Sequence, residues 1–384
     1  MKINIVSEQE RLNRTMTVNN RQLVTAMVVC VIYFRFLFVQ ERSFSYDYEA
    51  YIIFFRGIKD LGFDEILRRL SLTAPYVLVN EVGVLEFGFV LLVRVLEIWF
   101  SPYTTYAILA AASVGLRTYV IRSLGLSWPL IMLIQMYSIS LFEANALRAG
   151  LALSLSLLAL YCLSRNKKML GVIAVLASAS QHLQALIFWL PFAGVLAIQL
   201  RWLRGLRGML ILGPLGAIVL WQTIKLLGKS DFGKIRDYVN TVSGASGLNL
   251  FTIFSLLFLI ACLKATVISA RQRKLNNEKG RRSEGALIHE ALWIRTMYAS
   301  IPALMLTLFA TNFSTIGVRA WQFSFVIIAT TSFLIPTSNL DRQLKTAALY
   351  LLLTVSLTNN FLRYPLSNFF SPPLPYADIV PLWQ

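Results

Sequence analysis

Two arginines and a histidine at the ends of apolar segments have side chains suited to chemistry on a phosphorylated ligand. Arg148 opens the segment "LRAGLALSLSLLAL", Arg319 opens another in "STIGVRAWQFSF", and His182 stands in "SASQHLQALIF". Guanidinium groups bind phosphate oxygens through paired hydrogen bonds, and imidazole exchanges protons near neutral pH. Together they predict a diphosphate clamp beside a proton-transfer group. The simpler alternatives are arginines that reach lipid headgroups and a histidine hydrogen-bonded in the core.

Two carboxylates accompany these residues near the start of the chain. Asp47 stands in "FSYDYEAYIIFF" beside Tyr48 and Tyr51, and Glu86 stands in "VGVLEFGFVLL". A carboxylate among aromatic rings is a common way to hold sugar hydroxyls, although tyrosines here also fit an aromatic belt at a membrane interface. Asp47, Glu86 and His182 are therefore all candidates for a general base, and the sequence does not choose among them.

Further charged residues have two interpretations each. Lys234 and Arg236 lie in the polar stretch between Lys225 and Asn249, and they either hold an anionic headgroup or belong to a solvated loop. Glu143 precedes Arg148 by five residues, and it either holds the guanidinium or is solvated.

The elements that carry these residues are predicted to cross a membrane. Of the 384 residues, 57% are hydrophobic and only 14% are charged, and a crossing needs about 20 mainly apolar residues. We therefore predict an all-α, polytopic integral membrane protein. The candidate spans are Leu23–Val39, Thr104–Tyr119, Pro129–Phe142, Ala149–Leu163, Met169–Ser180, Leu183–Leu200, Met209–Leu226, Leu248–Val267, Ala291–Ala310, Trp321–Leu334 and Thr346–Phe361.

The net charge of +17 is distributed as in membrane proteins, which argues against nucleic acid as a partner. The basic residues gather in short clusters between the apolar runs, as cytoplasmic loops require. The clusters are Arg11 with Arg14 and Arg21, Arg117 with Arg122, Arg165 with Lys167 and Lys168, Arg201 with Arg204 and Arg207, Lys264 to Arg282, and Arg342 with Lys345.

These clusters fix the predicted topology. All of them lie inside if Val82–Phe100 rests in the interface or re-enters, which leaves about 11 crossings, within a range of about 10 to 12. The stretch Ala50–Ser71 has apolar residues at helical spacing and predicts one amphipathic helix on the outer surface. The candidate site residues then all lie at the outer, extracytoplasmic surface.

The predicted organisation is a single membrane domain with two tails. Residues 1–22 form a cytoplasmic tail, residues 23–362 the membrane domain, and residues 363–384 an extracytoplasmic tail. Outer segments occupy residues 44–100 and an outer loop residues 227–247. No acidic cluster of ligand spacing lies on the outer face, so no metal and no other cofactor is predicted.

Four stretches, in this order, resemble the EpsG-like, Wzy-type polysaccharide polymerases: "YDYEAYIIFF", "EFGFVLL", "NALRAGLALSLSLLALYCLSRNKK" and "SASQHLQALIFWLP". The resemblance runs from Tyr46 to Pro191, with a weaker echo around Arg319. It departs from the commoner family forms at Phe87, where a proline often follows the carboxylate, and at Ala149, where a glutamine often follows the arginine.

The resemblance implies a membrane glycosyltransferase of the GT-C-like architecture in a bacterial inner membrane. Such an enzyme transfers a growing glycan from undecaprenyl diphosphate to the non-reducing end of a new lipid-linked repeat unit, on the periplasmic side. We therefore expect Arg148 and Arg319 to bind the diphosphate and one of Asp47, Glu86 and His182 to act as the general base. Tyr48, Tyr51, Lys234 and Arg236 are the other expected contacts with substrate or diphosphate. Membrane lipids and a chain-length regulator protein are the other expected partners.

Two other classes share many of these features. A lipid-linked glycan ligase or a polyprenyl-phosphate-sugar glycosyltransferase uses similar outward charges, but ligases usually carry a much larger outer loop. A transporter or flippase of lipid-linked oligosaccharide tends to place charges at midmembrane and to contain two related halves. Here the charges gather at one surface and the halves show no repeat.

Overall fold

The structure is a computed structural model that describes residues 46–69, 76–79, 83–124, 126–138, 146–182, 184–197, 314–334 and 339–363, with scattered residues between 215 and 305. The helices with continuous description are α3 (Tyr46–Lys59), α4 (Phe63–Arg69), α5 (Phe87–Leu96), α6 (Pro102–Ser123), α7 (Trp128–Ser138), α8 (Leu147–Ser164), α9 (Lys168–Gln181), α10 (Gln184–Ala197), α15 (Ser314–Thr331) and α16 (Asn339–Arg363). A 3₁₀ turn, η6 (Ser332–Leu334), follows α15.

Two of the described helices are long and apolar enough to cross a membrane, and both were predicted as spans. They are α6, with 22 residues, and α8, with 18, which correspond to rises of about 33 and 27 Å. Two residues explain why helix α6 begins at Pro102. Proline has no N–H that would need an acceptor in the first turn, and the Ser101 hydroxyl accepts a hydrogen bond from the Thr104 N–H at 3.3 Å.

The total number of crossings stays a prediction. Three shorter apolar helices, Phe87–Leu96, Lys168–Gln181 and Gln184–Ala193, also occur among the described residues. At ten residues, α5 rises about 15 Å, which is half the thickness of a hydrocarbon core. Most of Leu23–Val39, Met209–Leu226 and Leu248–Val267 lies outside the described residues, as do most of the predicted tails and the predicted loop 227–247, and Ala291–Ala310 is described only in part.

The segment after the first predicted span differs from the prediction of one amphipathic helix. It forms two helices, α3 and α4, separated at Asp60–Gly62. The prediction was wrong here because the periodicity of the apolar residues continues across the break. Phe55 and Ile58 of α3 and Ile66 of α4 are all fully buried, so both helices pack against the rest of the protein.

A small hairpin is the one departure from helix in the described residues. Strand β1 (Tyr76–Val79) pairs antiparallel with β2 (Gly83–Glu86), and Tyr76 lies opposite Glu86. An apolar run of four residues carries no usable periodicity, so the all-α prediction missed it. The hairpin ends directly at the first residue of α5, which places Glu86 at the junction of strand and helix.

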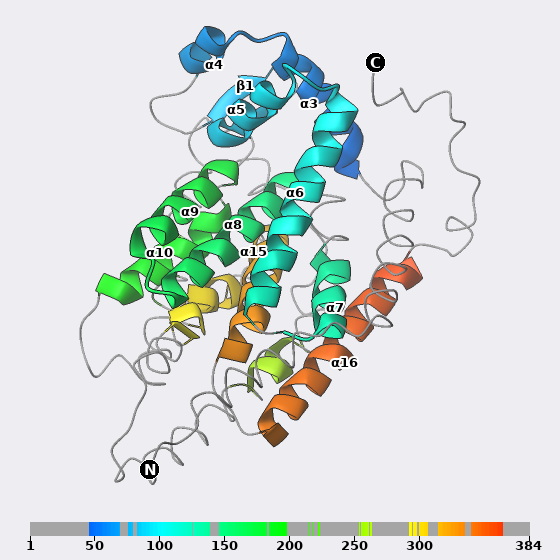
Figure 1. Ribbon diagram of the computed structural model, residues 1–384, viewed down its shortest axis with the longest axis vertical. Coiled ribbons are helices and arrows are strands. Elements are labelled where there is room, and N and C mark those ends of the chain that lie inside the picture. The colour runs from blue at the N-terminus through cyan, green and yellow to red at the C-terminus, as the bar shows by residue number, and fades with distance from the viewer. Residues whose placement is uncertain are drawn as a thin grey trace, which may run out of the picture.

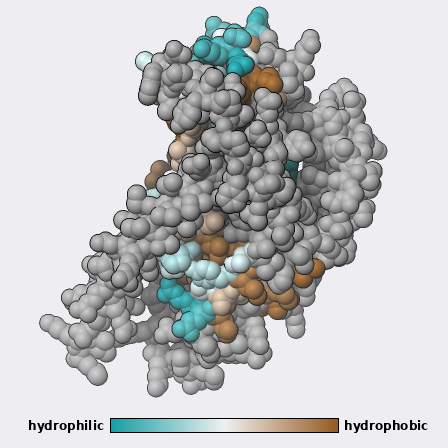
Figure 2. All heavy atoms as spheres, turned by 90° about the vertical axis from the view of Figure 1, so that its right-hand side faces the viewer, coloured by the Kyte–Doolittle hydropathy of each residue, from teal (hydrophilic) through white to brown (hydrophobic). Residues whose placement is uncertain are grey.

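Helices α8 and α9 pack closely through small residues. Gly171, Ala174 and Ser178 form the buried side of α9, and the Ser178 hydroxyl donates to the Ala152 carbonyl of α8 at 2.7 Å. Small residues let helix backbones approach in a membrane, where burial of apolar side chains supplies little driving force. The opposite side of α9 exposes Met169, Leu170, Val172, Ile173 and Leu176. In Figure 2, hydrophobic surface lies beside hydrophilic patches among the described residues.

Arg117 lies inside the helix bundle, where a cytoplasmic cluster with Arg122 was predicted. Its side chain on α6 is fully buried, and its Nε–H donates to Gln135 Oε1 of α7 at 2.8 Å. The hydropathy of the segment did not reveal this, because one arginine at the end of an apolar run looks the same whether it leaves the membrane or turns inward.

Figure 1 shows how these parts are arranged. Helices α8, α9 and α10 lie next to one another, α6 runs along them, and α3, α4, α5 and β1 gather at one end of this group. That end holds the start of α8 and the end of α9, because α3 packs on α5 and α6, and α5 packs on α9.

Candidate functional site

Three of the predicted site residues meet at the end of the bundle covered by α3 and α5. Arg148 donates from Nη1 to Glu86 Oε2, and His182 Nδ1 lies 2.6 Å from Glu86 Oε1. Arg148 also donates from Nε to the Tyr51 hydroxyl at 3.3 Å. We call Tyr51, Glu86, Arg148 and His182 the outer cluster.

Glu86 reaches both partners because it stands at the junction of β2 and α5. It occupies the residue before α5 in an extended conformation, and its side chain makes no capping hydrogen bond to that helix. The carboxylate is therefore available to other elements, and its side chain is only 4% exposed. Gly88, two residues later, lets α5 approach the end of α9, since a Cβ there would lie 2.8 Å from the Ser180 carbonyl oxygen.

Arg148 is the second residue of α8, where a positive charge is unfavourable for the helix. The N-terminal end of a helix carries a partial positive charge that attracts anions, and the first turn of α8 contains no acidic residue. Glu86 supplies the compensating negative charge from another element. The Arg148 side chain is 14% exposed, and among the described residues its Nη2 group has no hydrogen-bond partner.

Tyr51 is held in place by an aromatic cluster beneath the outer cluster. Its ring centroid lies 6.0 Å from each of the rings of Phe55, Phe89 and Tyr106, which come from α3, α5 and α6. The Arg148 guanidinium carbon lies 6.0 Å from the Tyr51 ring centroid, near the outer limit for a cation–π contact. Tyr51 thus connects the site to the packed end of the bundle.

His182 lies in the break between α9 and α10. Its backbone is extended, and its N–H donates to the Ser178 carbonyl at 3.1 Å, which closes the last turn of α9. The side chain is 22% exposed. Its second ring nitrogen, Nε2, lies 3.0 Å from Gln184 Oε1, so both nitrogens have partners.

The electrostatics of the outer cluster keep Glu86 ionised. Burial alone would raise the pKa of Glu86, but the positive charge of Arg148 and the hydrogen bond with His182 together hold that pKa well below its usual range. A carboxylate with so low a pKa accepts hydrogen bonds and does not take up a proton at neutral pH. Glu86 is therefore suited to be a counterion and an orienting group and unsuited to be a general base.

The same geometry leaves a proton-transfer role open to His182. Because a carboxylate can only accept, Nδ1 carries the proton that Glu86 binds, and a neutral imidazole then has its lone pair on Nε2. The cluster has no net charge with His182 neutral and a charge of +1 with His182 protonated. In the neutral ring, Nε2 is the atom that can accept a hydrogen bond from a ligand hydroxyl beside the Arg148 guanidinium.

The other predicted site residues are not part of these contacts. Asp47 and Tyr48 lie in the first turn of α3, four and three residues before Tyr51, and their side chains lie outside the described residues. Arg319 is exposed on α15, and none of the contacts given above for the cluster includes it. Lys234, Arg236 and Glu143 lie outside the described residues.

Sequence reasoning missed two residues at this site. Gln184 was not singled out although it stands two residues after His182, and Gly88 was noted only within a motif. An amide two residues from a histidine is a signal that could have been found. The close approach at Gly88 has no signal in the sequence, because it depends on which helix lies next to α5.

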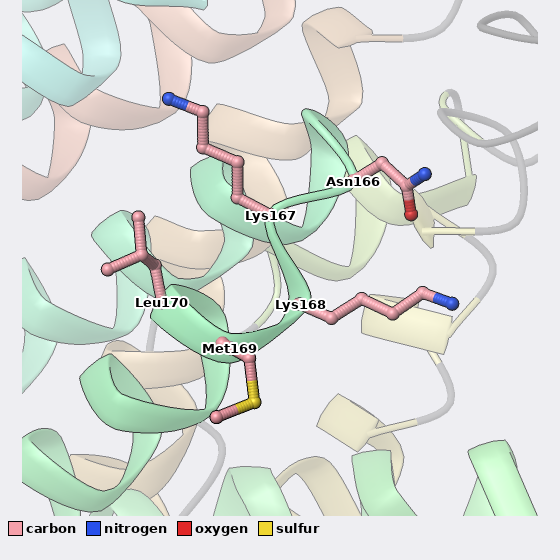
Figure 3. Close-up of a pocket in the computed structure, with 5 residues that line it drawn as sticks. All are labelled: Asn166, Lys167, Lys168, Met169 and Leu170. Atoms are coloured by element: carbon pink, nitrogen blue, oxygen red, sulfur yellow. The ribbon is translucent and has the colours of Figure 1, made fainter.

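The opposite end of α8 carries a basic turn, which we define as Arg165, Asn166, Lys167 and Lys168. Figure 3 shows that Lys167 and Lys168 point in different directions from this turn and that Asn166 to Leu170 line an open hollow. Asn166 adopts a φ of 60°, a conformation that asparagine tolerates better than most residues. The hollow lies one helix length away from the outer cluster.

The comparisons with known proteins identify the family. No curated protein and no solved structure matches the chain significantly. A model of the EpsG family matches residues 25–376, which include every residue of the outer cluster and the basic turn. The match covers most of the chain, and the protein therefore belongs to the EpsG family.

Proposed function

We propose that this protein polymerises undecaprenyl-diphosphate-linked oligosaccharide repeat units at the outer face of a bacterial inner membrane. Membership of the EpsG family gives it a broad role in polysaccharide polymerisation and makes it a membrane protein. The finer assignment is supported by one observation above all: an arginine, a glutamate and a histidine from the ends of three helices meet at one end of the bundle.

In the proposed reaction, the acceptor is a hydroxyl at the non-reducing end of a new repeat unit. Its oxygen attacks the anomeric carbon of the growing chain, and the bond from that carbon to the diphosphate oxygen breaks. The diphosphate leaves with the electron pair, and the hydroxyl proton passes to His182 Nε2. Each step balances without a metal or a redox partner, and the polymer moves to the new lipid carrier.

Four residues carry this mechanism, with His182 as the proton acceptor. Arg148 stabilises the leaving diphosphate through its Nη2 group, which has no partner in the part of the chain that the structure describes, because fixed positive charge favours the transition state in which negative charge develops. Glu86 holds His182 by Nδ1 and keeps Nε2 available, and Tyr51 fixes the guanidinium. Arg319, Asp47, Tyr48, Lys234 and Arg236 remain proposed substrate contacts that we expect to be less important than Arg148 and His182.

The proposed orientation is supported by the two ends of α8. Arg148 and the basic turn are separated by the 18 residues of the helix, a rise of about 27 Å that is close to the thickness of a hydrocarbon core. Basic turns prefer the cytoplasmic side. The outer cluster would then lie at the periplasmic surface, as part of a GT-C-like bundle of about 11 helices.

The test is a gel of surface glycan and lipid-linked glycan from cells that lack this gene. The cells are complemented with wild type, Arg148→Ala or His182→Ala, and protein amounts are compared by immunoblot. We expect a ladder of chain lengths with wild type and a loss of about a hundredfold or more with either variant. The matched controls are Arg165→Ala, at the other end of α8, and His289→Ala, the second histidine, and both should restore the ladder.

The pattern of the loss distinguishes polymerase from the other classes. Loss of a polymerase leaves single repeat units on lipid or at the surface. Loss of a ligase leaves long chains on lipid, and loss of a flippase leaves no repeat unit on the outer face. A normal ladder with His182→Ala at wild-type protein amounts would refute the base assignment, and a normal ladder in the uncomplemented strain would refute the function.

A further inference from the structure

Gln184 lies beside the outer cluster, and one of its two amide atoms has no partner among the described residues: Nε2 when Oε1 accepts from a protonated His182 Nε2, or Oε1 when the amide is turned to donate to the neutral ring. Its Oε1 lies 3.0 Å from His182 Nε2, while its Nε2 is buried and has no partner among the described residues. A buried amide donor without an acceptor is disfavoured in a folded protein, and each such group calls for an explanation. A ligand group that fills the site would supply the missing acceptor.

Gln181, on the other side of His182, gives a second and independent observation. It is the last residue of α9 and only 8% exposed, and its Oε1 is also buried without a partner among the described residues. One amide thus lacks an acceptor and the other lacks a donor. A sugar hydroxyl both donates and accepts, so a group of neighbouring hydroxyls matches this pair.

The chemistry of the pair separates it from the diphosphate site. Amides carry no net charge, so they add nothing to the attraction of an anion, whereas Arg148 carries a full positive charge on the other side of Glu86. The two glutamines next to His182 in the chain are therefore suited to an uncharged part of a substrate, such as the sugar hydroxyls at the non-reducing end of the acceptor.

We infer that Gln184, with Gln181, binds the acceptor sugar and sets its reacting hydroxyl against His182 Nε2. The Oε1 atom of Gln184 now lies where the hydroxyl oxygen must come, within hydrogen-bond distance of Nε2. When the acceptor enters, its hydroxyl takes the place of Gln184 Oε1 next to His182 Nε2. The hydroxyl oxygen then accepts a hydrogen bond from the Gln184 amide nitrogen. This inference rests on the proposed polymerase function and assigns residues to its acceptor half.

Glutamine suits this position because its amide can serve both protonation states of the histidine. Its oxygen accepts from Nε2–H of the imidazolium, and after a half-turn of the amide its nitrogen donates to Nε2 of the neutral ring. The ring is then held between turnovers by an uncharged amide on its Nε2 side.

The experiment separates acceptor binding from donor binding in the full-length protein reconstituted in liposomes. The donor is the lipid-linked repeat unit, and the acceptor probe is the free repeat-unit oligosaccharide released from that lipid by mild acid. Initial rates are measured against each substrate in turn, with the other saturating, for wild type, Gln184→Met, Gln184→Asn and Gln181→Leu. The control is Gln343→Met, which changes an exposed glutamine of α16.

We expect Gln184→Met to raise the KM for the acceptor probe about tenfold, the equivalent of one hydrogen bond, with the donor KM within about twofold of wild type. Gln181→Leu should act in the same direction, Gln184→Asn should recover part of the loss, and Gln343→Met should change nothing. An unchanged acceptor KM in Gln184→Met, or equal increases in both KM values, would overturn the inference.

Failure of the underlying function has a different signature. If wild type elongates no glycan in this assay, the polymerase proposal fails. If wild type elongates and Gln184→Met behaves like wild type, only the acceptor assignment fails. Should Gln184→Met not fold, as judged by thermal unfolding in detergent, the same comparison is made with Gln184→Asn and Gln181→Leu, and unchanged acceptor KM values in both would overturn the inference.

Discussion

At the residue scale, Glu86 determines what the outer cluster can do. It lies 62 positions from Arg148 and 96 from His182, yet one carboxylate oxygen binds each of them. Its low pKa follows from these two partners, because burial acts in the opposite direction. Because Glu86 already serves as a counterion, it is unsuited to be the general base. Of the three candidates from the sequence, Asp47 and His182 are left, and we propose His182.

Replacing Glu86 by glutamine keeps the shape and removes the charge. Arg148 then loses its counterion, and loss of one partner of a buried pair typically costs about 3–5 kcal/mol. We expect Glu86→Gln to lower the thermal unfolding midpoint and to reduce polymerisation by about a hundredfold. Fluorescence-detected unfolding in detergent and the glycan gel are the measurements.

The loss of stability in Glu86→Gln should depend on pH in one direction. A carboxyl whose pKa falls on folding stabilises the protein above its unfolded pKa, near 4.5, and this stabilisation is lost as the pH drops toward the folded pKa. The difference between wild type and Glu86→Gln should be complete at neutral pH and shrink only in acid. Glu65→Gln is the control, because the Arg68 side chain of its ion pair is 78% exposed. An equal effect of both substitutions would count against the counterion role.

Glu97 provides a second prediction, in which stability changes with pH in the opposite direction. It follows α5, is 3% exposed, and neither carboxylate oxygen has a hydrogen-bond partner among the described residues. Burial raises the pKa of Glu97 to about 8, although Lys59 and Arg94 act to lower it. A carboxyl whose pKa rises on folding favours the folded state most below its unfolded pKa, and stability falls as the pH rises through the folded pKa.

We therefore expect the unfolding midpoint to decrease by a few degrees between about pH 5 and pH 9. In Glu97→Gln this decrease should largely disappear, and the variant should be more stable than wild type at the alkaline end. Asp64→Asn, an exposed position on α4, is the control. A wild type and a Glu97→Gln variant with parallel pH profiles would show that Glu97 does not titrate in this range.

At the scale of elements, close helix contacts place the cluster. Helix α9 is held against α8 by the contact between Ser156 and Ser178, whose hydroxyls lie 2.8 Å apart, and α5 approaches α9 at Gly88. These contacts bring the start of α5 to the end of α9, which is where Glu86 meets His182. Small residues therefore decide the geometry of a site to which they contribute no functional group.

Gly88→Ala tests this placement. The added methyl group would overlap the Ser180 side chain and lie 2.8 Å from its carbonyl oxygen, so α5 must move away from α9. We expect the Glu86–His182 contact to break and polymerisation to fall about tenfold or more, since displacements of about 1 Å at an active site are costly.

The glycan gel measures this effect, with Gly115→Ala as its control. No atom lies within 4 Å of a Cβ at Gly115, and alanine there favours the helix. Combining Gly88→Ala with Ser180→Gly removes part of the overlap and should recover part of the activity. Full activity in Gly88→Ala alone would mean that α5 is not fixed by this contact.

At the scale of the whole molecule, α8 connects the outer cluster to the basic turn. The distribution of basic residues predicts which end is cytoplasmic, and the length of α8 permits the two ends to lie on opposite sides. We expect a cysteine at Lys167 to be inaccessible to a membrane-impermeant maleimide in intact cells and accessible after lysis.

A cysteine at Asp64, on α4 near the outer cluster, should react in intact cells whose outer barrier has been permeabilised. Both substitutions are made in a background without Cys30, Cys162 and Cys262, so that labelling reports one position. Labelling at Lys167 before lysis would invert the topology and move the outer cluster to the cytoplasmic side.

The amino-acid sequence was sufficient to predict the membrane class, the positions of α6 and α8, and the types of residue that meet in the outer cluster. It was sufficient because apolar runs of membrane length and isolated charges at their ends are properties of local composition. The packing of the helices was needed to show that Glu86, Arg148, His182 and Tyr51 meet, that Gln184 lies against His182 Nε2, and that Arg117 is buried in the bundle. Hydropathy shows that a helix has a buried side but not which helix covers it, so neighbours and charge partners are settled only by packing.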